Sequence, residues 1–205
     1  MSLHFEQEEF SKRQNRLLKL MAENELDGML LFRQESMFYL TGYDTFGYVF
    51  FQCLYLGGDG KLILLTRAPD LRQARNTSIV EDIRIWVDGP EVNPALQLKE
   101  ILRECGCAGQ RLGVEYDSYG LTAKNGKMLD SALDGFCELS DASELVNRLR
   151  VVKTSEELVY VRKAAELADD ALDEAHRLVK DGCDEGELLA AMQGAVFRGD
   201  GDYPG

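Results

Sequence analysis

Residues 149–176, LRVVKTSEELVYVRKAAELADDALDEAH, contain a strong helix start followed by a long amphipathic pattern. Thr154 and Glu157 have the spacing of a capping box, in which each side chain binds a backbone N–H of the other residue. Apolar residues then recur at steps of three and four, as on one helix face: Leu158, Val161, Ala165, Ala168, Leu172, Ala175 and Val179. We expect one long helix that ends near Gly182. Because alanine is the commonest residue of this stripe, another element must pack closely against it.

A second helix start follows this long helix. Asp184 and Glu187 offer another capping box, and ELLAAMQGAVF (187–197) is a suitable short helix. Within the chain, only this last helix is free to cover the alanine stripe. Two interpretations remain open at this point. The two helices are either a hairpin attached to a domain or the opening elements of a second domain.

The first 150 residues alternate between helical and strand patterns. We predict helices over 6–25, 35–42, 67–75, 93–105, 121–133 and 141–150, and strands over 27–32, 48–56, 61–66, 82–87, 111–116 and 135–140. The sequence GGDG (57–60) favours an antiparallel hairpin between two of these strands. Residues 1–150 are therefore expected to form an α/β domain with a mixed, roughly six-stranded sheet flanked by helices.

Charge and composition exclude several classes of partner. The chain has 205 residues, 23 basic and 36 acidic, and its formal charge of −13 would repel nucleic acids and anionic membranes. No apolar run is long enough to span a membrane, and the N-terminal residues are charged. We expect a cytoplasmic protein that binds neither nucleic acid nor membrane.

Residue types that carry chemistry are scarce. The five cysteines are scattered, and Cys105 and Cys107 are too close in sequence for a CxxC pair. The two histidines, His4 and His176, have no neighbouring ligand residues. The sequence also lacks the glycine-rich phosphate loops and the GxSxG elbow. We expect the cysteines to be reduced and predict no metal site in this chain.

Two segments carry a family resemblance. LDGMLLFRQESMFYLTGYDTF (26–46) and RLRVVKTSEELVYVRKAAELADDAL (148–172) resemble, in this order, the creatinase, Xaa-Pro peptidase and prolidase family. Members of that family join an N-terminal α/β domain to a C-terminal "pita-bread" catalytic domain. The resemblance implies that residues 151–205 are the start of a pita-bread α+β domain that is truncated here.

The resemblance implies a hydrolase of C–N bonds in a small peptide or amide, most simply an Xaa-Pro dipeptidase or aminopeptidase. A creatinase-like or ectoine-hydrolase-like amidohydrolase is the alternative within the family, and a non-catalytic binding or dimerisation module is the alternative outside it. In the family the metal ligands lie beyond the segment that matches this chain. We therefore expect no catalytic residue here, an inactive fragment, and a full-length homodimer that uses Mn, Co or Zn if it depends on metal.

The segment after YLTG often lines the catalytic pocket of the same or the partner subunit in this family. Here that segment is YDTFGYVFFQ (43–52), with the pocket candidates Tyr43, Phe46, Tyr48 and Phe50, together with Asp44. Aromatic rings supply rigid apolar walls, and tyrosine hydroxyls supply polar contacts. The alternative, that alternate aromatic residues merely fill the core, remains open and is favoured for Phe50 and Phe51.

One departure from the family pattern concerns the substrate. Creatinases place an arginine in this region to hold the substrate carboxylate, but no basic residue occurs between Arg33 and Lys61. A peptidase is therefore favoured over a true creatinase, with Arg67 or Arg72 as substitutes if the alignment is shifted.

Overall fold

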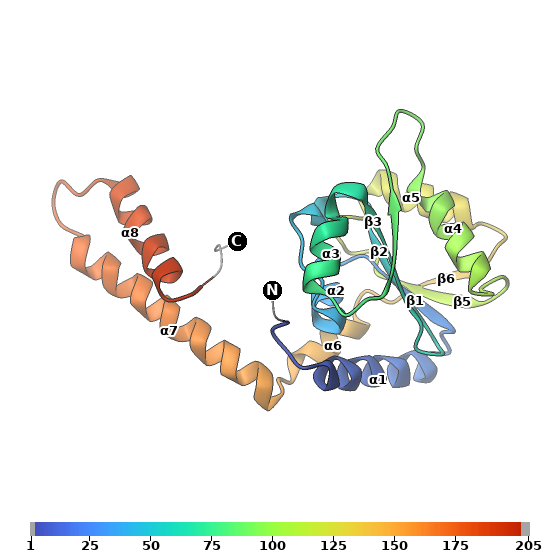
Figure 1. Cartoon of the computed structure of the whole chain (residues 1–205), viewed down its shortest axis with the longest axis horizontal. Helices are drawn as coiled ribbons and strands as arrows, with labels where there is room; N and C mark the ends of the chain where they lie inside the picture. The colour runs from blue at the N-terminus through green and yellow to red at the C-terminus, as the bar shows by residue number, and fades with distance from the viewer. Residues whose placement is uncertain (1–2, 202–205) are drawn as a thin grey trace. The chain divides into compact units, whose positions relative to one another are not determined.

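The structure is a computed structural model that describes residues 3–201 (Figure 1). The chain divides into two compact units, Met1–Val151 and Val152–Gly205. Each unit is described by itself.

The first unit is built on one six-stranded sheet. Its strands are β1 Gly28–Leu31, β2 Cys53–Gly57, β3 Leu62–Arg67, β4 Asp82–Trp86, β5 Arg111–Val114 and β6 Glu138–Asp141, in the spatial order β4-β3-β2-β1-β5-β6. Only β2 runs against its neighbours, β1 and β3, while the other adjacent pairs are parallel. The predicted mixed sheet is confirmed.

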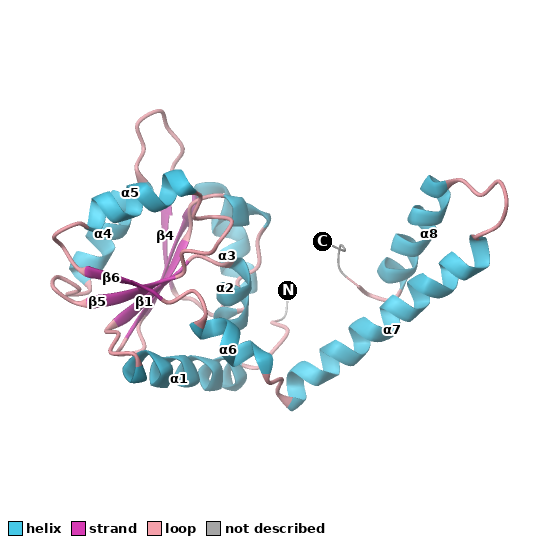
Figure 2. Cartoon of the chain, turned by 180° about the vertical axis from the view of Figure 1, so that it is seen from behind, coloured by secondary structure: helices cyan, strands magenta, loops and turns pink. Residues whose placement is uncertain are grey.

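Helices cover both faces of this sheet (Figures 1 and 2). They are α1 Gln7–Glu23, α2 Gln34–Thr41, α3 Leu71–Thr77, α4 Pro94–Glu104, α5 Ala123–Leu133 and α6 Leu145–Val151, with 3-10 turns η1 Phe46–Val49 and η2 Ala68–Asp70. Side chains of α1, α2, α3 and α6 share one core with Met29 and Leu31 of β1. Those of α4 and α5 share the opposite core with Leu30. Because successive side chains of β1 point to opposite faces of the sheet, this strand contributes to both cores.

Local sequence signals fix several helix ends. Gly42 ends α2 in the left-handed conformation, at φ 80°, which glycine adopts at little cost. The Asn93 side chain accepts a hydrogen bond from Ala95 N at the start of α4, where Pro94 occupies the first turn. The predicted strand over 48–56 is wrong in its first part, because residues 46–49 form η1 and β2 begins only at Cys53.

The second unit is a pair of packed helices, α7 Ser155–Leu178 and α8 Glu185–Arg198. The capping box of Thr154 and Glu157 is present. The helix ends at Leu178, four residues before Gly182, which lies in the loop at φ 78°. None of the described helices in either unit has both the length and the apolar composition required to cross a bilayer.

The covered side of α7 differs from the predicted stripe. The half-buried apolar positions are Leu167, Ala171, Ala175 and Leu178. Of the predicted stripe only Ala175 belongs to this set, whereas Val161 and Leu172 are about half exposed, at 49% and 50%. The described part of α8 therefore leaves most of the predicted stripe uncovered, and the buried row of α7 is a neighbouring one.

Candidate functional site

Aromatic side chains gather on the surface of the first unit around η1. Phe46 is 77% exposed, Tyr48 41% and Phe50 42%, and the ring of Tyr119 packs edge-on against Tyr48 at 6.0 Å between centroids. Tyr119 itself is 75% exposed. We call these four residues the aromatic surface. Exposed apolar side chains that gather in this way are candidates for a binding surface.

A buried polar anchor holds η1 in place. Thr45 Oγ1 accepts a hydrogen bond from Gly47 N at 2.9 Å and donates one to Asp70 Oδ1 at 2.5 Å. Gly47 lies so close to the Asp70 carboxylate that a β-carbon at this position would overlap it. The exposed rings therefore project from a turn that is fixed to η2.

Arg67 connects the aromatic surface to β4 and its loop. Its guanidinium lies over the ring of Phe50, 3.8 Å from the centroid, a cation–π contact. Arg67 Nη2 also donates to Asp88 Oδ2 at 2.7 Å, and Nε contacts both oxygens of the same carboxylate. Arg67, one of the two substitutes considered for the creatinase arginine, thus lies beside Phe50. Arg72 is exposed on α3.

Tyr43 occupies a different environment from the other three pocket candidates. It is fully buried, and its hydroxyl donates to Gln52 Oε1 at 2.8 Å and lies 3.0 Å from Thr66 Oγ1. Burial raises the pKa of Tyr43 to about 12. The structure places Phe46, Tyr48 and Phe50 at the surface and Tyr43 in the core that α1, α2, α3 and α6 cover. Phe51 is also buried, in the core that α4 and α5 cover.

A crevice that the sequence analysis missed adjoins the aromatic surface through Tyr119. It has a volume of about 540 Å³ and is lined by Arg33 and Glu35 after β1, residues 117–119 after β5, and Asn147 and Arg150 of α6. Because these segments lie far apart in the sequence, no spacing pattern could have identified them. The one signal in the sequence was that polar residues, Arg33 and Asp117, come directly after the predicted strands 27–32 and 111–116.

Glu115 lies buried at the end of β5, in the residues that lead into this crevice. Its Oε2 accepts hydrogen bonds from the backbone N–H groups of Phe32 and Arg33, at 3.1 and 3.0 Å. Burial raises the pKa of this carboxyl to about 7, although the hydrogen bonds and the Arg33 charge act in the opposite direction. The group thus titrates near neutral pH.

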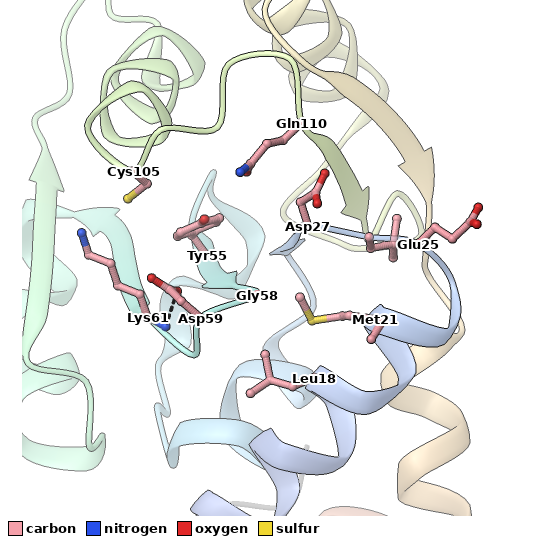
Figure 3. Close-up of a pocket in the computed structure, with 12 residues that line it drawn as sticks. Leu18, Met21, Glu25, Asp27, Tyr55, Gly58, Asp59, Lys61, Cys105 and Gln110 are labelled. Atoms are coloured by element: carbon pink, nitrogen blue, oxygen red, sulfur yellow. Dashed lines mark hydrogen bonds between the residues drawn. The ribbon is translucent and has the colours of Figure 1, made fainter.

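A second pocket lies at the other end of the parallel strands (Figure 3). It has a volume of about 600 Å³, with Leu18 and Met21 on one wall and Asp27, Asp59 and Lys61 around it. The Asp59 carboxylate is engaged by the backbone N–H of Lys61 at 2.9 Å.

The described residues do not fit a hydrolytic metal centre. Among residues 3–201, no three His, Cys, Asp or Glu side chains converge in a way that could hold a metal ion. A two-metal hydrolase needs several carboxylate or imidazole ligands around its ions. We therefore assign no metal-dependent step to residues of this chain.

Comparison with known proteins gives consistent matches. Residues 13–152 match the creatinase/prolidase N-terminal domain model. The chain is 27% identical over 210 residues to an uncharacterized hydrolase/peptidase of Sinorhizobium fredii, covering 99% of this chain and 53% of that protein. It is also 27% identical over 222 residues to the ectoine hydrolase of Halomonas elongata, covering 100% of this chain and 55% of that protein. The chain thus spans about half the length of these curated relatives.

Solved structures agree on the fold. The recombinant prolidase from Thermococcus sibiricus superposes with a TM-score of 0.78 at 19% identity, over 94% of this chain and 50% of that one. The sheet order, the helices on both faces and the family model together identify the first unit, and the chain belongs to the creatinase/prolidase N-terminal domain family.

Proposed function

We propose that this chain is the N-terminal part of an enzyme that hydrolyses C–N bonds in small peptides or amides, most simply an Xaa-Pro dipeptidase or aminopeptidase. Family membership of residues 13–152 supports a hydrolase, and the matched proteins named hydrolase/peptidase, ectoine hydrolase and prolidase support this bond class. In this proposal residues 151–205 open the catalytic domain, and the remainder of that domain lies in a longer protein.

The observation that carries the proposal is the aromatic surface. Phe46, Tyr48 and Phe50 are exposed although they are large and apolar, and the anchor at Thr45 holds their turn in place. Rigid aromatic walls with two tyrosine hydroxyls suit a small amphipathic substrate. We propose that this surface forms one wall of the substrate pocket, in its own subunit or across a homodimer. Tyr43 would support that wall through its buried hydrogen bonds.

One observation favours the second candidate, a creatinase-like or ectoine-hydrolase-like amidohydrolase. Arg67 places a guanidinium against Phe50, at the edge of the aromatic surface. A forked cation there would suit a substrate that carries a carboxylate. Because Asp88 already engages two nitrogens of this guanidinium, the contact would use its remaining N–H groups.

The metal and the location are parts of the same proposal. Divalent Mn, Co or Zn would be held by residues of the longer protein, since the described residues form no such cluster. The five cysteines are free thiols, which suits the reducing cytoplasm.

A substrate panel tests the proposal. The longer protein would be stripped of metal, reloaded with Mn²⁺, Co²⁺ or Zn²⁺, and assayed with Ala-Pro, ectoine and creatine. The present chain, treated in the same way, is the matched control and is expected to be inactive. Turnover of Ala-Pro supports the peptidase, and turnover of ectoine or creatine supports the second candidate. Hydrolysis of none of the three would favour a non-catalytic binding or dimerisation module.

A further inference from the structure

The crevice beside Tyr119 lies at a switch point of the sheet topology. β1 and β5 are adjacent and parallel, but the chain leaves β1 for α2 on one face and leaves β5 for α5 on the other. Strand ends that diverge in this way leave an opening at their carboxyl edge, where open α/β sheets bind small ligands. The crevice of about 540 Å³ is lined by residues from both divergent connections.

Arg33 offers a fixed cation in this crevice. Its Nε and Nη2 donate to the Asp117 carbonyl oxygen at 3.1 and 2.8 Å, and Nη2 also contacts the Asp117 carboxylate at 3.1 Å. The side chain is only 13% exposed. Among the described residues none accepts a hydrogen bond from Nη1. The guanidinium is therefore held in one orientation with one nitrogen available to a ligand.

The main chain that carries Arg33 is itself fixed. Glu115 accepts from the backbone N–H groups of Phe32 and Arg33 and, at 2.6 Å, from Ser36 Oγ. These bonds join the end of β5 to the start of α2, the two connections that diverge. Glu115 is thus a positioning residue, because it sets where the Arg33 side chain begins.

Acceptors line the same crevice. Glu35 is exposed in the first turn of α2, and no residue in the described part of the chain donates to its carboxylate. Asn147 donates its amide N–H group to Glu144, which leaves the amide oxygen as an acceptor. A primary ammonium has three donors to distribute over such groups.

The charges of the lining residues balance. Arg33 and Arg150 are offset by Glu35 and Asp117. A phosphate or another multiply charged anion would meet these two carboxylates in a chain whose formal charge is already −13. A ligand with one positive and one negative group can pair its negative group with an arginine and its positive group with a carboxylate of this crevice.

We propose that this crevice binds a small zwitterion, an amino acid or short peptide, with its carboxylate at Arg33 and its ammonium at Glu35 and Asn147. The ring of Tyr119 contributes an apolar wall for the part between the two charges. The site shares Tyr119 with the aromatic surface, but it lies within the first unit and needs no catalytic residue, so its binding can be measured apart from hydrolysis.

Titration of the 205-residue chain with three related probes tests the charge pattern. Glycylglycine carries both charges, N-acetylglycine only the negative one, and glycinamide only the positive one. Amide chemical shifts report the location. We expect saturable shifts around Arg33, Ser118 and Tyr119 with glycylglycine and at least about tenfold weaker binding of each single-charge probe, because each lacks one charge-assisted contact. Equal binding of N-acetylglycine, or no saturable shift with glycylglycine, would overturn the proposal.

Variants test the residues. Arg33→Gln and Glu35→Gln should each weaken glycylglycine binding about tenfold or more. Lys61→Gln changes a charge in the similarly sized pocket of Figure 3 and should leave the affinity unchanged. Glu35 is exposed, so its variant keeps the test valid if Arg33→Gln fails to fold. Loss of binding in Lys61→Gln, or full affinity in Glu35→Gln, would contradict the assignment.

Discussion

Ser36 Oγ donates a 2.6 Å hydrogen bond to Oε1 of Glu115, 79 positions further along the chain, and both side chains are fully buried. The residue at the N-cap of α2, Arg33, makes no side-chain capping bond. The Glu115 carboxylate instead ties the residues that lead into α2 to the neighbouring strand, since it also accepts from Phe32 N and Arg33 N. A negative charge near the N-terminus of α2 also interacts favourably with the helix dipole.

Glu115 should make the stability of the chain depend on pH. Burial raises the folded-state pKa from 4.5 to about 7. Between these two values the folded chain keeps a proton that the unfolded chain releases, so stability falls as the pH rises through this window. Across this window the free energy of unfolding should fall by about 3 kcal/mol. Urea unfolding of the wild type and of Glu115→Gln between pH 5 and 8 measures it. The variant should lose most of this slope, whereas the exposed control Glu35→Gln should keep it. An unchanged slope in Glu115→Gln would refute the buried titration.

Tyr43 and Tyr48 should respond differently to loss of the hydroxyl. Tyr43→Phe removes a buried hydroxyl that bonds to Gln52 and lies 3.0 Å from Thr66, and it should destabilise the chain by about 1–3 kcal/mol, although Gln52 and Thr66 keep the bond between them. Tyr48→Phe changes a side chain that is 41% exposed and should stay within about 0.5 kcal/mol. Urea unfolding at pH 7 compares the two variants. Equal stabilities of the two variants would show that the buried Tyr43 hydroxyl does not contribute to folding stability.

Gly47→Ala should disturb the aromatic surface. The added methyl group overlaps the Asp70 carboxylate, so we expect a loss of about 1–3 kcal/mol. Gly126→Ala is the matched control, because nothing lies near the new β-carbon within α5, and it should stabilise by up to about 1 kcal/mol. A thermal melt of each variant gives the comparison. A neutral Gly47→Ala would mean that the turn is not fixed to Asp70.

Residues 1–151 should fold alone. The buried core residues lie almost entirely within this unit, and in the described part of the second unit only Ala195 is buried. A fragment of residues 1–151 should therefore unfold cooperatively, with a midpoint close to that of the first transition of the whole chain. Broad, non-cooperative unfolding of this fragment would place the boundary elsewhere.

Local signals explain how much of the fold the sequence predicts. Gly42, Asn93 and the pair Thr154 and Glu157 act within one helical turn, so their capping roles can be identified from spacing alone. The turn at η1 could not be predicted in this way. Its aromatic residues favour a strand, but the hydrogen bond from Thr45 to Asp70 joins groups 25 positions apart and overrides that preference.

The candidate site was predictable only in part for the same reason. Phe46, Tyr48 and Phe50 belong to one continuous segment, so a family resemblance was enough to select them. Tyr119 comes from a distant loop and meets Tyr48 only after β5 pairs with β1. The side of α7 that packs on α8 was missed because several apolar rows run along that helix, and periodicity does not say which one a partner covers.

The central claim is that the aromatic surface forms a wall of the substrate pocket in the longer protein. The most direct test is kcat/KM of that protein, on the substrate that it hydrolyses, with Phe46→Ala and Tyr48→Ala beside the exposed control Val87→Ala. We predict a fall of about tenfold or more for the two aromatic variants, with an unchanged melting temperature, and no change for the control. Wild-type kcat/KM in both aromatic variants would contradict the claim.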